Sequence, residues 1–173
     1  MSNLKNPLRI NVGFFINQPN GIYREIEFEL PGIKLATDLR SGVIYGTVRI
    51  SRTSEGLLVQ GDFQTQVNAE CVRCLDDFSQ TLHTQFTELF NFHMPLYYHE
   101  EDSDEDSDLV VPEDGYIDLA PLVREYLLLE YPINPICRPD CKGLCPQCGE
   151  NLNLATCEHC AVPATVKSLT PGS

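Results

Sequence analysis

The sequence has no apolar run long enough to span a membrane. No segment of its 173 residues approaches the roughly 20 consecutive apolar residues that a spanning helix needs. The N-terminal stretch MSNLKNPLRINVGFF also lacks the unbroken apolar core of a signal peptide. We therefore expect a soluble protein of a reducing cytoplasm, with no membrane partner.

Basic residues are scarce. The chain has 12 Lys and Arg against 25 Asp and Glu, which gives a formal net charge of −13. Wide contact with nucleic acid needs clustered Lys and Arg, so this composition argues against strong direct binding to nucleic acid and favours a basic protein as partner. Nine of the acids lie in residues 100–114, a segment without a base. We interpret this segment as a solvated loop or linker, or else as a docking surface for a basic partner.

Catalytic motifs are missing too. The four histidines, at positions 83, 93, 99 and 159, form no HExxH pair. There is also no nucleophile elbow and no glycine-rich phosphate loop. The sequence therefore predicts a protein that is not an enzyme.

Apolar residues tend to alternate between residues 8 and 92, as half-buried strands require. The segments 43–50 and 57–67 predict a hairpin around TSEG. The stretch 78–92 fits either a helix or a strand, and its Thr and Phe content favours a strand. Two further runs of alternation each predict one buried strand face: Ile10, Val12, Phe14 and Ile16, then Ile22, Ile26, Phe28 and Leu30.

A helix is expected at 116–132, with Asp118 as its N-cap and Pro132 at its end. The predicted fold class is α+β: a mainly antiparallel β body, either a sheet or a partly open barrel, with one or two helices and a small zinc-bound, zinc-ribbon-like tail. The expected divisions are a body at 1–98, an acidic loop or linker at 99–115, the helix packing on the body at 116–132, a zinc-binding tail at 133–162 and a flexible C-terminus at 163–173.

The eight cysteines form four closely spaced pairs. In a reducing compartment, paired cysteines are more often metal ligands or redox groups than disulfides. Zinc in a structural site takes four thiolate or imidazole ligands, and one Cys-x2-Cys turn supplies two of them. The pairs are Cys71-x2-Cys74, Cys137-x3-Cys141, Cys145-x2-Cys148 and Cys157-x2-Cys160.

The C-terminal pairs predict the best single zinc site. In CPQCG, Pro146 stiffens the turn and Gly149 permits a positive φ. His159 competes as a ligand between the last two cysteines. The four ligands of this site would be Cys145, Cys148, Cys157 and Cys160.

The partition of the other cysteines stays open at this point. Cys137 and Cys141 could replace one pair of the first site, or could join Cys71 and Cys74 in a second site. We therefore predict one or two structural zinc ions. Free reduced thiols remain an alternative for CVRC, because it lacks the Gly-Pro signature of a zinc knuckle. A redox role for this pair is disfavoured by the two acids that follow it and by the lack of a following helix.

Four segments in this order resemble the YceD family, the large ribosomal RNA subunit accumulation proteins of bacteria and plastids. They are AECVRCLDDF, a long acidic gap, IDLAPLVREYLLLEYPINPIC and DCKGLCPQCGENLN, so the resemblance covers roughly residues 8–160. After residue 160 the chain lacks the Asp-Pro-Arg and apolar helix that commonly close the family's proteins. Cys71 and Cys74 fall on the family's central pair, and five cysteines fall on its tail: Cys141, Cys145, Cys148, Cys157 and Cys160.

The resemblance implies a part in ribosome biogenesis, in the plastid stroma if the chain comes from a plastid lineage. Together with the excess of acid, it predicts a non-catalytic factor that binds a basic ribosomal protein or a large-subunit assembly intermediate. Two alternatives stay open. One is a redox-responsive regulator that uses Cys71 and Cys74. The other is a direct RNA-binding zinc module. Its support is a set of basic residues near the cysteines, Arg124, Arg138, Lys142 and Lys167, although nearby acidic residues offset their charge.

Overall fold

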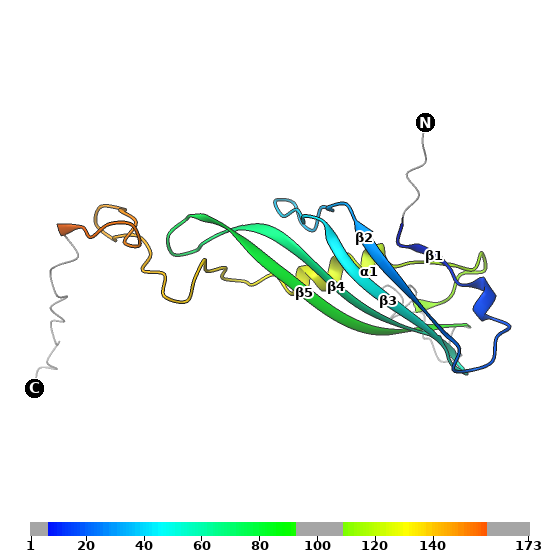
Figure 1. Cartoon of the computed structure of the whole chain (residues 1–173). Helices are drawn as coiled ribbons and strands as arrows, with labels where there is room; N and C mark the ends of the chain where they lie inside the picture. Colours follow the sequence, from blue (N-terminus) through cyan, green and yellow to red (C-terminus); the bar gives the residue numbers. More distant parts are fainter. Residues whose placement is uncertain (1–6, 93–108, 159–173) are drawn as a thin grey trace, which may run out of the picture. The chain divides into compact units, whose positions relative to one another are not determined.

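The computed structural model describes residues 7–92 and 109–158, and its main element is a four-stranded sheet. The strands follow one another as a meander, in the order β2-β3-β4-β5 (Figure 1). β2 pairs antiparallel with β3, and β3 pairs antiparallel with β4. The strands are β2 (Tyr23–Leu30), β3 (Ile44–Arg52), β4 (Gly56–Glu70) and β5 (Asp77–Asn91).

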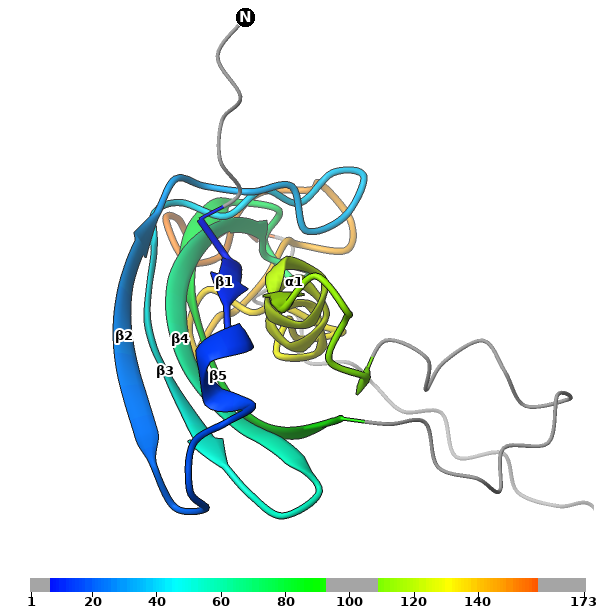
Figure 2. The ribbon, with the colours of Figure 1, turned by 90° about the vertical axis from the view of Figure 1, so that its right-hand side faces the viewer.

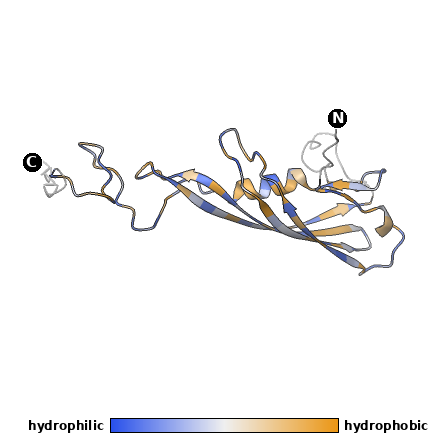
Figure 3. Cartoon of the chain, turned by 45° about the horizontal axis from the view of Figure 1, so that its top comes forward, coloured by the Kyte–Doolittle hydropathy of each residue, from blue (hydrophilic) through white to orange (hydrophobic). Residues whose placement is uncertain are grey.

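Alternation along the strands determines which face of the sheet is buried. Hydrophobic and hydrophilic residues take turns along the long strands (Figure 3). The predicted hairpin is present as β3 and β4, and the stretch 78–92, which fitted two structures, lies in β5. Leu82, Thr84, Phe86 and Phe90 of β5 are buried, and the polar residues that alternate with them, His83, Gln85 and Thr87, are exposed. One face of β4 is buried throughout: Leu57, Val59, Phe63, Thr65 and Val67.

A single α-helix among the described residues covers the inner face of this sheet. The four strands curve around α1 (Ala120–Leu129), as Figure 2 shows end-on. Val123 and Leu127 of the helix are buried in the core of the sheet. The helix begins later than the sequence predicted: Leu119 is the N-cap, and the Asp118 carboxylate accepts the Ala120 N–H at 2.9 Å.

The residues before the helix form a strand, because they pair with the N-terminal segment. β6 (Tyr116–Asp118) is antiparallel to β1 (Arg9–Asn11). The predicted first strand through residue 16 is therefore wrong beyond Asn11. The N–H groups of Val12 and Gly13 both donate to the Gly115 carbonyl, and the chain turns into the short helix η1 (Gly13–Phe15).

The chain groups into two units. The sheet unit consists of Met1–Asn68 and Gln80–Pro132, and the cysteine unit consists of Ala69–Ser79 and Ile133–Ser173. Residues 69–79, which the sequence assigned to the body, thus group with the C-terminal segment. The acidic segment predicted as a loop lies, up to residue 108, outside the described residues.

The fold class is confirmed in its main part, because the described residues form a mainly antiparallel sheet with one α-helix. Within residues 7–92 and 109–158, no helix is long and apolar enough to cross a membrane.

Two glycines make room for aromatic rings on the inner face of the sheet. A Cβ on Gly46 would lie 2.2 Å from a ring carbon of Phe63, and one on Gly61 would lie 2.4 Å from a ring carbon of Phe86. These rings stack with centroids 6.1 Å apart, and the Phe86 ring stacks on Tyr126 of the helix at 4.9 Å. The absent side chains thus let the aromatic layer approach the backbone.

We predict that Gly61→Ala lowers the free energy of unfolding by about 1–3 kcal/mol, because the added methyl group displaces the Phe86 ring. Chemical denaturation of the full chain measures this. Gly13→Ala is the matched control, since its nearest contact would be an ordinary 3.5 Å. The double variant Gly61→Ala, Phe86→Leu should lose less free energy of unfolding than the sum of the losses in the two single variants. Additive losses would contradict the packing explanation.

Candidate metal centre

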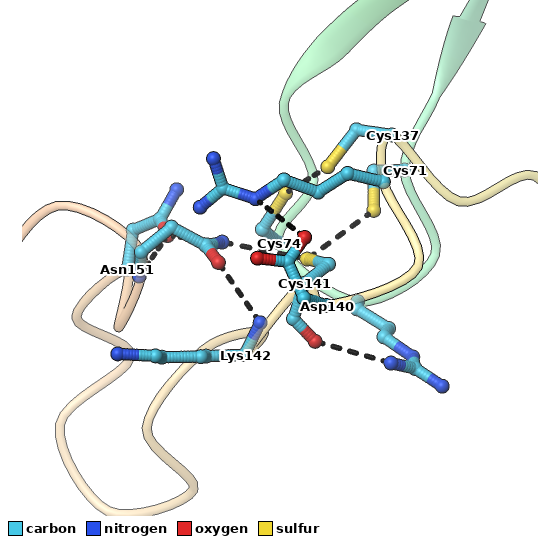
Figure 4. Close-up of polar contacts among 10 residues, drawn as sticks. Cys71, Cys74, Cys137, Asp140, Cys141, Lys142 and Asn151 are labelled. Carbon is cyan, nitrogen blue, oxygen red and sulfur yellow. Dashed lines mark hydrogen bonds and ion pairs between the residues drawn. The ribbon is translucent and has the colours of Figure 1, made fainter.

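Four cysteine sulfurs from two distant segments meet in the cysteine unit. The Sγ atoms of Cys71, Cys74, Cys137 and Cys141, here the first cluster, all lie within 4.8 Å of one another (Figure 4). Cys71 Sγ lies 3.8 Å from Cys141 Sγ, and Cys74 Sγ lies 3.7 Å from Cys137 Sγ. Four thiolates around a tetrahedral ion at a metal–sulfur distance of about 2.3 Å would lie about 3.8 Å apart. The first cluster therefore fits a metal ion.

Three more cysteines form a second cluster. The Sγ atoms of Cys145, Cys148 and Cys157 also lie within 4.8 Å of one another. The predicted fourth ligand, Cys160, and its competitor His159 lie outside the described residues. None of the seven described cysteines forms a disulfide, so their thiols are available to a metal ion.

The structure groups Cys137 and Cys141 with Cys71 and Cys74, and not with the turn at Cys145. Apolar residues pack around the first cluster, among them Phe78, Ile136 and Leu144. Cys71, Cys74 and Cys141 are buried. A bound ion would thus be shielded from water on most sides.

The two Cys-x2-Cys turns share one backbone fold. In each turn, the N–H of the first cysteine donates to the carbonyl five residues later, and the N–H four residues later donates back to the first cysteine's carbonyl. In the first turn, the bonds are Cys71 N to Asp76 O at 3.0 Å and Leu75 N to Cys71 O at 2.9 Å. In the second turn, they are Cys145 N to Glu150 O and Gly149 N to Cys145 O, both at 2.8 Å.

The residue after the second cysteine has a positive φ in both turns. It is Gly149 at 75° in one turn and Leu75 at 59° in the other. Leu75 is the one residue other than glycine with a positive φ among those described. The sequence suggested that CVRC lacks a knuckle signature, yet its backbone makes the same turn. Leucine hid the turn, because sequence patterns expect glycine at this position.

Backbone N–H groups also prepare the sulfurs for negative charge. Burial raises the pKa of the Cys71 thiol, but N–H groups of Cys137, Cys74 and Arg73 donate to its sulfur and lower the pKa to about 6. N–H groups of Cys148 and Gln147 act in the same way on Cys145 and lower its pKa to about 6.

Neighbouring thiols oppose further ionisation. The Asp76 N–H lowers the pKa of Cys74, but burial and the surrounding thiols outweigh it, so this pKa is raised. One sulfur of the first cluster is thus readily ionised while its neighbour holds its proton. A cation among the sulfurs would let all four become thiolates.

The region of the chain that contains the cysteines is similar to known proteins. A family model described as "Large ribosomal RNA subunit accumulation protein YceD" matches residues 59–167, which hold all eight cysteines. The chain belongs to the YceD family. The resemblance drawn from the sequence motifs is thereby confirmed.

Several relatives match part of this YceD chain. An uncharacterized protein of Mycobacterium tuberculosis is 37% identical over 118 residues, which are 68% of this chain and 56% of that protein. Uncharacterized protein YlbN of Bacillus subtilis is 32% identical over 68% of this chain and 66% of its own length. Large ribosomal RNA subunit accumulation protein YCED homolog 1, chloroplastic, of Zea mays is 26% identical over 72% of this chain and 50% of its own length. The chain thus spans only about half to two thirds of these relatives, and no solved structure matches it.

The backbone of the first turn gives a direct test. Leu75 and Val72 are both about half exposed, at 56% and 50%, but only Leu75 has a positive φ. Leu75→Gly relieves a conformation that costs a side chain roughly 1–2 kcal/mol, whereas Val72→Gly relieves nothing. We predict that the Leu75→Gly protein has a free energy of unfolding higher than the Val72→Gly protein by about 1–2 kcal/mol. Equal values in chemical denaturation of the cysteine unit within the full chain would contradict the shared turn.

Proposed function

We propose that this protein is a non-catalytic factor in biogenesis of the large ribosomal subunit, where it supports accumulation of large-subunit rRNA. Support comes from the family description and from the name of the maize relative. The structural support is the first cluster, because two cysteine pairs that are distant in sequence, Cys71/Cys74 and Cys137/Cys141, form it together within the region that the family model matches.

The proposal includes two structural zinc ions, one in each cluster. Zinc is the metal that four tetrahedral thiolates suit, and it has no redox chemistry of its own. Four protein ligands leave no coordination position for a water or a substrate, which supports a structural role rather than a catalytic one. Cys160 would complete the second cluster as its fourth ligand.

The outer face of the sheet favours a basic partner. Glu25, Glu27 and Glu29 follow one another at every second position of β2, and all three are exposed. A groove of about 530 Å³ crosses this face, with Glu25, Glu27 and Asp62 among its lining residues. Arg49, also in the groove, lies 4.0 Å from Glu25. Acids therefore outnumber bases along the groove, and a Lys- or Arg-rich segment of a ribosomal protein would complement it.

Native mass spectrometry of protein purified without added metal tests the zinc ions. We expect two zinc ions per chain, and one in either of two double variants: Cys71→Ser with Cys74→Ser, or Cys145→Ser with Cys148→Ser. Val72→Ser, in the same turn, should keep both ions. Absence of metal from the unaltered chain, with a reversible Cys71–Cys74 disulfide, would replace this proposal with the redox alternative.

Depletion of the protein from its host cell tests the assembly role. We expect the ratio of large-subunit to small-subunit rRNA to fall, and the unaltered chain to restore it. Lysine at positions 25, 27 and 29 should restore it poorly, because these changes reverse the charge of β2 on the outer face, where Glu25 and Glu27 line the groove. Lysine in place of Asp38, Glu55 and Glu113, which are exposed acids in loops, changes the net charge equally and should restore it.

An unchanged rRNA ratio after depletion would refute the assembly role. A gel shift with large-subunit rRNA fragments at physiological salt addresses the RNA-binding alternative. The proposal predicts weak binding or none by the protein alone, because its charge repels phosphates.

A further inference from the structure

The loop inside the second cluster reaches the first cluster. Residues 151–153, here the NLN segment, lie in sequence between Cys148 and Cys157, which are both members of the second cluster. The segment pairs with the residues that follow Cys141: Asn151 forms an antiparallel bridge with Leu144, and the Leu152 N–H donates to the Gly143 carbonyl at 2.9 Å.

The residues in the middle of this arrangement bind the first turn directly. The Leu144 N–H donates to the carbonyl of Arg73, which lies between Cys71 and Cys74, at 3.0 Å. A Cβ on Gly143 would lie 3.0 Å from the same carbonyl, and Gly143 has a φ of +74°. The backbone of residues 143–144 therefore connects the first turn on one side with the NLN segment on the other.

Asn153 contacts a sulfur of the first cluster. Its Nδ2 donates to Cys141 Sγ at 3.4 Å, and its Oδ1 accepts the N–H of Lys142 at 2.8 Å. In Figure 4, dashed lines end at the labelled residues Cys141 and Lys142. Asn151 Oδ1 fixes the orientation of this amide, because it accepts both the backbone N–H of Asn153 at 3.0 Å and its Nδ2 at 2.9 Å.

Asn151 contacts the first turn. Its Nδ2 donates to Asp76 Oδ2 at 2.7 Å, and the Asp76 carbonyl accepts the Cys71 N–H that closes the first turn. The two asparagines thus contact both Cys141 and the turn of Cys71. Both asparagines belong to a loop whose two ends are cysteines of the second cluster.

From these contacts we infer that the NLN segment couples the two clusters, so that a metal ion in the second cluster strengthens metal binding in the first. A metal ion between Cys148 and Cys157 fixes both ends of the loop and so orders it. Metal binding in the first cluster then carries no further entropic cost of ordering the loop. The coupling is reciprocal, so a metal ion in the first cluster strengthens binding in the second by the same factor. Asn153 is a positioning residue for Cys141, and the inference rests on the metal sites proposed above.

Titration of the metal-free, reduced full chain with cobalt(II) tests the coupling. Cobalt gives a sulfur-to-metal charge-transfer band, and competition with a chelator gives the affinity of the first cluster. Loss of the second cluster through Cys145→Ser with Cys148→Ser should lower this affinity about 10–100-fold, the range typical for partners of metal ligands. Gln147→Ala, at an exposed position between these two cysteines, keeps the backbone N–H that donates to Cys145 and should leave this affinity unchanged.

A double-variant cycle assigns the coupling to Asn153. We expect Asn153→Ala alone to lower the affinity of the first cluster about 10-fold, and loss of the second cluster to lower it little further in that background. Asn153→Asp keeps the acceptor for Lys142 but puts a carboxylate beside the Cys141 sulfur, so it should weaken binding at least as much. Both variants should move the charge-transfer band to longer wavelength, because the sulfur loses an N–H donor.

The outcomes separate this inference from the proposed function. Two bound metal ions with independent affinities would overturn the coupling and leave the zinc sites standing. A coupling of the same size in the Asn153→Ala background would overturn the role of Asn153. A chain that binds no metal would overturn both the inference and the zinc sites.

Discussion

The meeting of two short chain segments around four sulfur atoms is the constraint on which the cysteine unit depends. Cys71 and Cys74 lie in the turn between two long strands, and Cys137 and Cys141 follow the helix. Few apolar residues surround them, with Phe78, Ile136 and Leu144 as the main contacts. So small a core cannot hold two chain segments together strongly by burial alone. The polar contacts of the sulfurs supply part of the rest, and the proposed metal ion would supply more.

The sheet unit is held together by different forces. Its inner face is closed by α1 and by a stack of aromatic rings that approach the backbone at Gly46 and Gly61. Burial of that face supplies the stability of the unit. The outer face of the strands is therefore not needed for core packing, and its residues can be polar and acidic. This separation explains how one sheet can present a charged groove without weakening its core.

The sequence predicted those parts of the fold that follow from local periodicity. Alternation located β2 to β5, and the run of leucines before Pro132 located the helix. The first strand was predicted too long, because nothing local shows that Gly115 would bind the N–H groups of Val12 and Gly13. Likewise the helix start moved by one residue, because Asp118 is held in a strand by its pairing with Arg9.

The candidate metal centre shows the same limit. Spacing identified the cysteine pairs but not which pairs share a site. Cys137 and Cys141 lie close to Cys145 in sequence and far from Cys71, yet the structure groups them with Cys71. Only the tertiary arrangement decides between those groupings. Leu75 hid the first turn from any pattern that requires glycine, and the contacts of Asn151 and Asn153 had no signal beyond the motif CGENLN.

The separation of Cys71 and Cys74 from Cys137 and Cys141 also affects how the chain is made. The first two sulfurs emerge from the ribosome long before the other two, after which β5 and α1 must still be synthesised. Until then, the early turn offers half a coordination shell, and it lacks the Cys137 N–H that does most to lower the pKa of Cys71. A nascent chain at that stage could hold a metal ion only weakly. Capture of the ion would thus be a late event in biosynthesis, and a chain truncated before Cys137 could not complete it.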